Sequence, residues 1–486
     1  MTAEPRGGLD REGAGVEGVR VIVLGLGLSG TAAARALAAA DVGDLLVVDT
    51  RDTPAVRERA AALRAAGVDA RPGVTDAATL AGAGLVVTSP GVAPGNPILA
   101  AATAGGQRVW SEPELAWRLN SGRTRLVAVT GTNGKTTTTE LVAACLRAPV
   151  GGNIGTPLCD LLTGADAPAL AVAELSSFQL RFTDRLRADV GVLLNVAPDH
   201  LDWHGTLDDY TAAKARVWAN QRPEGAPGPD GRDWAVVGVD DAGARAAAAA
   251  HPPPAGVAAA TSAPPGPGEV GVAGGVIVSR LGVDTEVVAV DALPARGPHN
   301  VANAVAAVAA AVCAGADPAG LAGPLTSQRP GPHRLEQVAT LAEVAYVNDS
   351  KATNPHAAAA ALRSFGAPGS PSVVWIAGGL GKGLDFADLA AVVRERVRVA
   401  VTVGRSGPEI AALTRRLGVP TVEAGTLGRA VREAAARARA GDTVLLAPAC
   451  ASMDQFRDYA ERGQAFRDAV AAVASPHPAK EGAGGR

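Results

Sequence analysis

Short hydrophobic runs recur along the chain, and each leads into a glycine-rich or polar turn. The first three runs lie at residues 19–24, 45–48 and 85–87, and an alanine-rich stretch from about Thr31 to Ala40 separates the first two. Uninterrupted apolar runs of this kind are typical of strands that are buried on both faces. Because strands alternate with a helix, we predict an α/β protein whose parallel sheets bind ligands at the carboxyl ends of their strands.

The strand–helix pattern restarts twice. It resumes at the run 126–129, after a polar stretch at 120–123, and again beyond 328–332, where two prolines forbid a continuous helix. A chain of 486 residues is too long for one hydrophobic core. We therefore predict three domains: an N-terminal Rossmann-like nucleotide-binding domain (1–122), a central P-loop ATPase-like parallel sheet (123–329), and a C-terminal Rossmann-like α/β domain (330–486). Strands of the last domain are expected at 372–376, 399–403 and 443–446.

One segment of the central third departs from this pattern. Residues 221–275 are rich in Pro, Gly and Ala, and only 234–239 resemble a strand. Such a composition is typical of loops and of segments that cannot bury enough apolar surface to fold. We predict that most of this segment is loop and that part of it is disordered.

Charge and composition narrow the function classes. The net charge of -3 argues against a protein that binds nucleic acid or anionic membranes. Residues 1–18 are polar and glycine-rich, unlike a signal peptide, and no stretch of about 20 apolar residues lacks a charge or a break. The four cysteines lie far apart, which is typical of reduced, structural thiols. We expect a cytoplasmic protein that binds neither nucleic acid nor membranes.

The strongest chemical motif is TGTNGKTT at residues 130–137, directly between a predicted strand and a predicted helix. Glycines let the backbone wrap around a phosphate, and the amides and helix N-terminus supply positive potential. In such loops the lysine reaches the β- and γ-phosphates, and the hydroxyl that follows can ligate Mg²⁺. Only two residues separate the glycines, where the usual P-loop has four, so this is a variant. The motif predicts ATP binding.

A second glycine-rich turn is less specific. Gly25, Gly27 and Gly30 form GxGxxG after the first strand, and Asp49 ends the next one. This meets the formal fingerprint of a dinucleotide site. The same turn can bind any nucleotide diphosphate, however, and the chain offers no obvious site for hydride transfer. An NAD-dependent dehydrogenase is therefore a minor alternative.

Together these motifs resemble those of the Mur ligase family over nearly the whole chain. The matching stretches are 25–30, 88–92, the ATP loop, 151–155, 174–180, 195–202, 210–214, 297–303, 332–334, 348–355 and 448–456. The stretch 349–354 (DSKATN) is similar to the branch that adds D-glutamate. Relatives with other substrates carry an Asp-Tyr-Ala-His or Asp-Gly-Ala-His type of segment there. The resemblance implies a ligase that adds D-glutamate to UDP-N-acetylmuramoyl-L-alanine through an acyl phosphate, in peptidoglycan precursor synthesis.

The resemblance also implies catalytic and metal-binding roles. The catalytic residues would be Lys135, Glu174, His200, Lys214 and Lys351. Thr136 and Glu174 would hold the Mg²⁺ ion on ATP, and His200 and Lys214 a second Mg²⁺ ion. Since an ammonium cannot ligate a cation, Lys214 would act as a carbamate. Taken alone, Lys214 is more ordinarily a solvated helix lysine, Glu174 a strand-end carboxylate and His200 a loop histidine.

Three groups of binding residues follow from the same resemblance. ATP would contact Gly131, Thr132, Asn133, Gly134, Lys135, Thr136, Thr137, Asn300, Asn303, Arg334 and Asp349. The UDP substrate would contact Gly27, Leu28, Ser29, Asp49, Thr50, Arg51, Ser89, Gly91, Asn153 and His200. D-Glutamate would contact Thr353, Lys382, Ser452, Met453 and Tyr459. Met453 and Tyr459 stand where the family pattern leads us to expect Leu and Phe, and Asn300 could instead be a helix cap.

Two further alternatives remain at this stage. One is a related ATP-dependent amide ligase with another acceptor, of the folylpolyglutamate type. The other is a non-catalytic nucleotide-binding protein of the same fold. The complete set of Lys135, Glu174, His200, Lys214 and Lys351 argues against the second, because a protein without catalysis has no physical reason to keep both metal sites.

Overall fold

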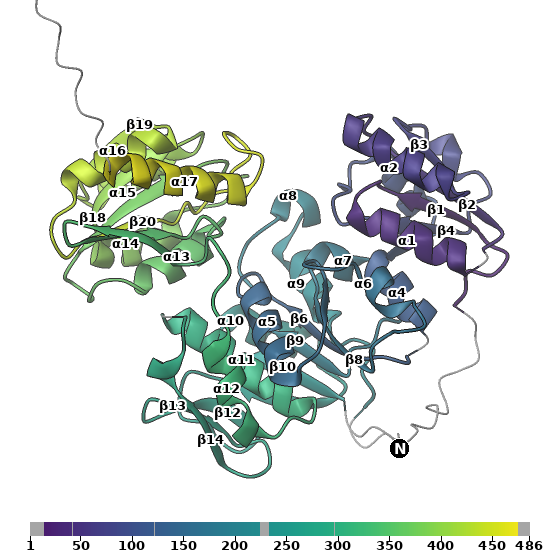
Figure 1. The fold of residues 1–486 in the computed structure, drawn as a ribbon, viewed down its shortest axis with the longest axis horizontal. Coiled ribbons are helices and arrows are strands. Elements are labelled where there is room, and N and C mark those ends of the chain that lie inside the picture. The colour runs from purple at the N-terminus through teal and green to yellow at the C-terminus, as the bar shows by residue number, and fades with distance from the viewer. Residues whose placement is uncertain (1–13, 41, 121, 224–232, 296, 475–486) are drawn as a thin grey trace, which may run out of the picture. The chain divides into compact units, whose positions relative to one another are not determined.

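The structure is a computed structural model that describes residues 14–40, 42–120, 122–223, 233–295 and 297–474 (Figure 1). The chain divides into two compact units, and each is described by itself. The first holds the residues up to Leu293 together with Ala302–Gln328, and the second holds Pro294–Val301 and the residues from Arg329 onward. The strands form three sheets, and the three domain bounds given above stay a prediction. Within the described ranges, no helix is long and apolar enough to cross a membrane.

The first unit begins with a five-stranded parallel sheet in the order β3-β2-β1-β4-β5. Its strands are β1 (Arg20–Leu24), β2 (Asp44–Asp49), β3 (Asp69–Pro72), β4 (Leu85–Thr88) and β5 (Arg108–Ser111). Its helices are α1 (Leu28–Ala39), α2 (Pro54–Ala65), α3 (Pro97–Ala104) and α4 (Glu112–Asn120). Val21 and Val23 pack into one core and Ile22 and Leu24 into another, so both faces are covered, as the apolar runs predict.

The same unit contains a nine-stranded sheet in the order β14-β13-β12-β11-β10-β9-β6-β8-β7. Its strands are β6 (Arg125–Thr130), β7 (Val150–Gly152), β8 (Leu170–Glu174), β9 (Val190–Leu193), β10 (Trp234–Gly238), β11 (Gly256–Ala260), β12 (Glu269–Ala273), β13 (Val276–Ser279) and β14 (Thr285–Ala289). Its helices are α5 (Lys135–Leu146), α6 (Leu158–Leu162), α7 (Ser177–Arg181), α8 (Leu201–His204), α9 (Leu207–Ala215), α10 (Ala242–Ala250), α11 (Pro298–Cys313, of which the part from Ala302 belongs to this unit) and α12 (Ala322–Ser327). Strand β6 pairs in parallel with both β8 and β9, so the loops that follow these three strands lie side by side.

The prediction that residues 221–275 are mostly loop fails for the described part of the segment. There, strands β10, β11 and β12 and helix α10 hold 24 of 46 residues and extend the central sheet, while 224–232 lie outside the described residues. Helix α10 is almost entirely alanine, the best helix former, and the side chain of Asp241 caps it by accepting from the Ala244 N–H. The alanines that suggested low complexity are therefore helix and strand residues.

Helix α4 fastens the first sheet to the central sheet. The buried carboxylate of Glu114 accepts the backbone N–H groups of Asp184, Arg185 and Leu186 at 2.9, 2.9 and 2.8 Å. The equally buried Glu112 accepts the Cys159 N–H at the start of α6 at 2.5 Å. Both glutamates thus satisfy backbone donors of the central part from a helix that follows the first sheet.

The second unit contains a six-stranded sheet in the order β15-β16-β20-β17-β18-β19, in which only β15 is antiparallel. Its strands are β15 (Glu336–Leu341), β16 (Val344–Asn348), β17 (Val373–Gly378), β18 (Val397–Val403), β19 (Thr421–Gly425) and β20 (Thr443–Leu446). Its helices are α13 (Pro355–Arg363), α14 (Ala390–Arg396), α15 (Gly407–Arg416), α16 (Leu427–Arg437) and α17 (Tyr459–Ala474). Along β17, Val373 and Trp375 pack toward α13 and α14, and Val374 and Ile376 toward α16 and α17. The three strands predicted here are β17, β18 and β20.

Candidate active site

The predicted ATP loop joins β6 to α5. Gly134 caps the helix with φ +83°, a left-handed conformation that favours glycine, and a Cβ atom there would lie 2.3 Å from Oδ1 of Asn303. Asn195, after β9, holds the loop from the side: its Oδ1 accepts the Asn133 N–H at 2.8 Å, and its Nδ2 donates to the Asn133 carbonyl at 3.1 Å. Asn195 therefore fixes the loop from one side, and Asn303, from a distant part of the first unit, lies against Gly134.

Polar side chains of this loop make contacts that define its inner surface. Lys135 Nζ donates to the carbonyls of Gly131 and Thr132, both at 2.9 Å. The Thr132 hydroxyl lies 3.0 Å from the Tyr210 hydroxyl of α9. Thr136 is buried at the start of α5, and Thr137 is partly exposed beside it. A lysine, a hydroxyl and a helix N-terminus thus lie together, as phosphate binding requires.

Glu174 ends β8, next to the loop. Its side chain is 1% exposed, and its Oε1 accepts from Asn153 Nδ2 at 2.6 Å. Its other oxygen, Oε2, is buried and has no hydrogen-bond partner in the described part of the chain. A buried carboxylate oxygen without a partner is costly, and a bound cation would satisfy it. Within the described ranges, no three His, Cys, Asp or Glu side chains form a metal-binding group.

Lys214 is buried, so the reading as a solvated helix lysine is wrong. Its side chain, on α9, is 1% exposed, and its Nζ donates to the Gly131 carbonyl at 2.7 Å. The ring of Tyr210 lies 4.5 Å from the same nitrogen. Burial, together with the nearby charge of Lys135, lowers the pKa of Lys214 well below its ordinary value, although Asp199 and Glu174 act in the opposite direction. Burial and the charge of Lys135 thus disfavour the protonated form of Lys214 beside the ATP loop.

His200 lies on the same side of the central sheet, between the end of β9 and α8. It adopts φ +53°, and its ring contacts Phe178 edge-on with the ring centres 4.8 Å apart. Its Nε2 lies 3.7 Å from Asp199 Oδ2. The structure thus brings together Lys135, Thr136, Glu174, Lys214 and the ATP loop, and it places His200 in the aromatic cluster beside α9.

His204 belongs to this cluster and was not among the residues expected from the sequence. Its ring stacks on Phe178 at 5.7 Å, and its Nε2 lies 2.9 Å from the Ser177 hydroxyl. Burial lowers the pKa of His204 to about 4, so its imidazole is neutral near pH 7. Asn195 and Tyr210 were also missed as site residues, although both lie in stretches that resemble the family. His204 carried no signal, because only the packing of α8 reveals its position.

In the first sheet, the residues expected at the UDP substrate lie on loops, or at the start of helix α1, directly after neighbouring strands. Gly27, Leu28 and Ser29 follow β1, Thr50 and Arg51 follow β2, and Ser89 and Gly91 follow β4. Chain order reverses between β1 and β4, and sheets of this class bind ligands at that point. Asn153, in contrast, follows β7 of the central sheet, where it contacts Glu174.

Asp49 has a role within the protein. Its two oxygens accept four hydrogen bonds: the N–H groups of Leu26 and Arg51 at 2.8 and 2.9 Å, and two from the Arg51 guanidinium at 3.0 and 2.9 Å. Burial alone would raise the pKa of Asp49, but these hydrogen bonds lower it. A carboxylate accepts about four hydrogen bonds, so this one leaves no acceptor site for a ribose hydroxyl. That weakens the dinucleotide interpretation of the GxGxxG turn.

The residues expected at D-glutamate follow parallel strands of the second unit. Lys351 and Thr353 follow β16, Lys382 follows β17, and Ser452 and Met453 follow β20. Leu380 and Ala451 exchange two backbone hydrogen bonds, of 2.8 and 3.0 Å, which join the second and third of these loops. Tyr459 begins α17, and its ring centre lies 3.9 Å from Lys351 Nζ. Met453 is exposed and Ser452 is buried.

The remaining residues expected at ATP lie on α11 and near β16. Asn300 and Asn303 lie in the first two turns of α11, which begins at Pro298, so Asn300 is not its cap. Arg334 precedes β15, and Asp349 directly follows β16, where its Oδ1 accepts the Leu335 N–H at 3.1 Å. Burial raises the pKa of Asp349 to about 7, although the nearby Arg334 acts in the opposite direction.

Comparison with known proteins shows which family shares this sequence. Family models match as follows: MurD-like, N-terminal domain of Mur ligases at residues 19–111, Mur ligase middle domain at 129–311, and Mur ligase, glutamate ligase domain at 333–450. The UDP-N-acetylmuramoylalanine–D-glutamate ligase of Frankia casuarinae is 46% identical over 94% of this chain and 94% of its own. That of Streptomyces avermitilis is 42% identical over 93% and 98%.

The fold itself is that of a solved ligase. The crystal structure of UDP-N-acetylmuramate–alanine ligase from Thermotoga maritima matches with a TM-score of 0.55, at 19% identity, over 94% of this chain and 100% of that one. The family models that match the three parts of the chain and the curated relatives indicate the same family. The chain belongs to the Mur ligase family, and within it to the group of UDP-N-acetylmuramoylalanine–D-glutamate ligases.

Proposed function

We propose that the protein joins D-glutamate to UDP-N-acetylmuramoyl-L-alanine, with ATP as the energy source, in the cytoplasm. The L-alanyl carboxylate attacks the γ-phosphorus of ATP, which gives an acyl phosphate and ADP. The amine of D-glutamate then attacks the acyl carbon, an amide bond forms, and phosphate leaves as the nitrogen loses its proton. The ATP loop with Glu174 and the buried Lys214 beside it is the observation that carries this proposal.

The first step brings an anionic carboxylate to a polyphosphate. One pair of like unit charges 4 Å apart repels by about 4 kcal/mol at an effective dielectric constant near 20, and several such pairs occur. Lys135 lies where the β- and γ-phosphates would reach the loop, and it would exchange its two loop carbonyls for phosphate oxygens. The N–H groups of the loop and of α5 would supply the remaining donors.

Mg²⁺ would supply further neutralisation of the phosphates when bound. The partnerless Oε2 of Glu174 and the hydroxyl of Thr136 would hold the ion on ATP. His200 and Lys214 would hold a second ion. The deprotonated form of Lys214, which burial favours, would add to carbon dioxide with formation of an N–C bond and release of one proton, and the resulting carbamate would be an oxygen ligand. We include this modification in the proposal.

The second step needs a bound dicarboxylic amino acid. Lys351 and Lys382 would pair with carboxylates of D-glutamate, and Thr353 and Ser452 would donate hydroxyl hydrogen bonds. Asn300, Asn303, Arg334 and Asp349 would contact ATP, in keeping with their positions in the family pattern. Since one chain carries all of these groups, we propose that it acts as a monomer.

Phosphate release by the purified protein tests the proposal. With Mg-ATP, UDP-N-acetylmuramoyl-L-alanine and D-glutamate present, we expect release that stops when either the nucleotide substrate or the amino acid is omitted. The variant Lys135→Ala is expected to release almost none. Turnover with a folate acceptor, and none with the nucleotide substrate, would contradict the proposal and favour the folylpolyglutamate type of ligase.

A further inference from the structure

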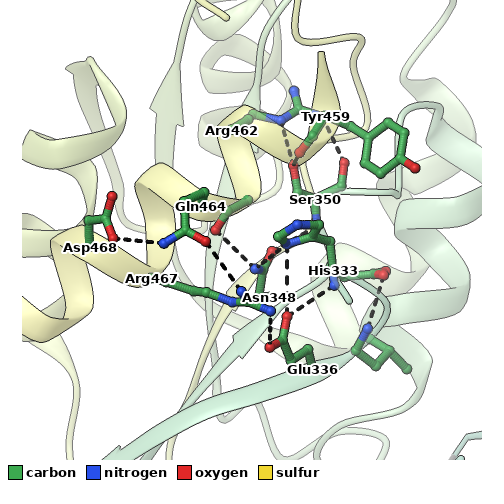
Figure 2. A network of polar contacts seen from close by, with 12 residues as sticks. His333, Glu336, Asn348, Ser350, Tyr459, Arg462, Gln464, Arg467 and Asp468 are labelled. Carbon is green, nitrogen blue, oxygen red and sulfur yellow. Dashed lines mark hydrogen bonds and ion pairs between the residues drawn. The ribbon is translucent and has the colours of Figure 1, made fainter. Parts of the chain in front are cut away.

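A buried polar network lies behind the loops expected to bind D-glutamate, and it lies wholly within the second unit (Figure 2). It is centred on two side chains to which the sequence assigned no role. One is Arg462 of α17, which is 2% exposed, and the other is Asn348 at the end of β16, which is 0% exposed. Each connects segments that are far apart in the chain.

Arg462 connects the loop after β16 to the loop after β20. Its Nε donates to the Ser350 hydroxyl at 3.0 Å and its Nη2 to the Ser350 carbonyl at 2.9 Å, while its Nη1 donates to the Cys450 carbonyl at 3.0 Å. Burial lowers the pKa of Arg462 to about 10, so the group is still charged at pH 7. Ser350 directly precedes Lys351, and Cys450 lies two residues before Ser452. One planar guanidinium therefore sets the spacing between these two loops.

Asn348 connects the same loop to the segment that carries Arg334. Its Oδ1 accepts the Ser350 N–H at 3.1 Å, and its Nδ2 donates to the Gly463 carbonyl at 3.1 Å and to Nδ1 of His333 at 2.9 Å. Because the amide nitrogen is the donor in the last contact, Nδ1 of His333 carries no proton. The lowered pKa of His333, caused mainly by burial and then by Arg467, agrees with a neutral ring.

The backbone around His333 shows how tightly these segments are joined. His333 adopts φ +63°, and its carbonyl accepts the Lys351 N–H at 3.2 Å. A Cβ atom on Gly463 would lie 2.2 Å from His333 Nδ1, so only glycine allows α17 to approach the ring this closely. On the other side of Lys351, the Tyr459 ring lies under the ammonium group, and the Tyr459 carbonyl accepts from the Ser350 hydroxyl at 2.8 Å.

We propose that Arg462 and Asn348 are positioning residues for the amino-acid substrate, which hold Lys351 at a fixed distance from Ser452 and from Arg334. This inference rests on the proposed function, because it assumes that these loops bind D-glutamate. Neither side chain needs to touch the substrate. They act through the backbone of residues 350–351 and 450. Their loss should therefore alter the amino-acid site and leave the nucleotide substrate's site unchanged.

A network that merely stabilises the fold predicts something different. It would lower the amount of active enzyme and reduce kcat without a selective change in one KM. A positioning role predicts instead that KM for D-glutamate rises while KM for UDP-N-acetylmuramoyl-L-alanine is unchanged. Steady-state kinetics in which each substrate is varied in turn separate the two.

The first experiment compares Arg462→Gln with wild type and with Arg457→Gln as a matched control. Arg457 belongs to the same stretch of chain, but its side chain is 85% exposed and pairs with Glu461 on the surface. We expect Arg462→Gln to raise KM for D-glutamate by roughly tenfold or more, since three hydrogen bonds from a charged group are lost. Arg462→Lys, which can reach one loop but cannot bridge both, should recover part of the loss.

Several outcomes would overturn the inference. Equal effects on the KM values for ATP, the nucleotide substrate and D-glutamate would contradict it. So would a lower kcat with KM for D-glutamate unchanged. If Arg462→Gln fails to fold, Ser350→Ala is used in its place, because it removes only the hydroxyl contacts. A selective but smaller rise in KM for D-glutamate is then expected, and the absence of a rise would contradict the inference. If wild type itself does not turn over D-glutamate, the proposed function fails, which is a separate result.

A second experiment uses pH as a readout. Asn348→Asp places a carboxylate oxygen opposite two acceptors, the Gly463 carbonyl and His333 Nδ1. A proton on Nδ1 relieves one of these repulsions. The other charged groups near His333 are Glu336, whose Oε2 lies 3.8 Å from Nδ1, and Arg334, Asp458 and Arg467, and the substitution leaves all of them in place. The ratio of KM for D-glutamate in the variant to that in wild type should therefore fall as pH is lowered from 8 to 6. A ratio that does not depend on pH would show that His333 does not transmit the change to the loop of Lys351.

Discussion

Gly134 offers a sharp test of the ATP loop, because two different costs can be separated there. An alanine at Gly134 must adopt φ +83°, which costs about 1–2 kcal/mol for an L-residue, and its Cβ would lie 2.3 Å from Asn303 Oδ1. Real contacts are never that short, so either the asparagine or the loop must move. Gly67 has the same φ of +83° but no atom within 4 Å of such a Cβ, and Gly67→Ala therefore measures the backbone cost alone.

The expected difference lies in nucleotide affinity. Both variants should lose similar stability from backbone strain, visible as a lower Tm. Only Gly134→Ala should weaken ATP binding, by about tenfold or more, which corresponds to about 1.4 kcal/mol, because the shifted loop no longer aims its N–H groups and Lys135 at the phosphates. Calorimetric titration with Mg-ATP measures this. If Gly134→Ala binds Mg-ATP as tightly as Gly67→Ala does, our account of the loop is refuted.

Three glutamates give further predictions. Glu174→Gln keeps the acceptor for Asn153 but weakens the cation site, so kcat should fall on the order of 100-fold; equal rates at saturating Mg²⁺ would contradict a metal role. Glu114→Ala leaves three backbone N–H groups, including that of the buried Leu186, without their acceptor and should cost about 4 kcal/mol, measured by denaturant unfolding; a loss below 1 kcal/mol would count against the role of α4. Burial raises the pKa of Glu112 from 4.5 to about 7. The protonated side chain therefore contributes about 3 kcal/mol to the free energy of unfolding below pH 4.5, and this stabilisation is lost as pH rises to 7. Glu112→Gln lacks that titration, and its Tm relative to wild type should therefore increase between pH 4.5 and 7; a constant difference would refute this.

The sequence predicted features that depend on local pattern. The ATP loop requires glycine, lysine and threonine at fixed spacing between a strand and a helix, and these are contiguous in the chain. The strands with long apolar runs were predicted for the same reason. Strands β7 (VGG) and β19 (TVEAG) were missed because they contain too few adjacent large apolar residues to form a distinct run.

Features that depend on packing could not be predicted in this way. Lys214 looks like a surface residue in the sequence, and only the seating of α9 against the ATP loop buries it. Arg462 and Ser350 are 112 residues apart, and no local pattern connects them. The alanine-rich stretch at 242–250 shows the opposite problem, since a low-complexity composition concealed a regular helix.

The central claim is that the chain couples ATP cleavage to the addition of D-glutamate, and the stereochemistry of the amino acid tests it most directly. The purified protein would be incubated with Mg-ATP, UDP-N-acetylmuramoyl-L-alanine and either D- or L-glutamate, and the nucleotide product would be weighed by mass spectrometry. Our account predicts a product heavier by one glutamyl residue with the D isomer only, and one phosphate released for each product formed. Addition of L-glutamate at an equal rate, or phosphate release without a heavier product, would contradict it.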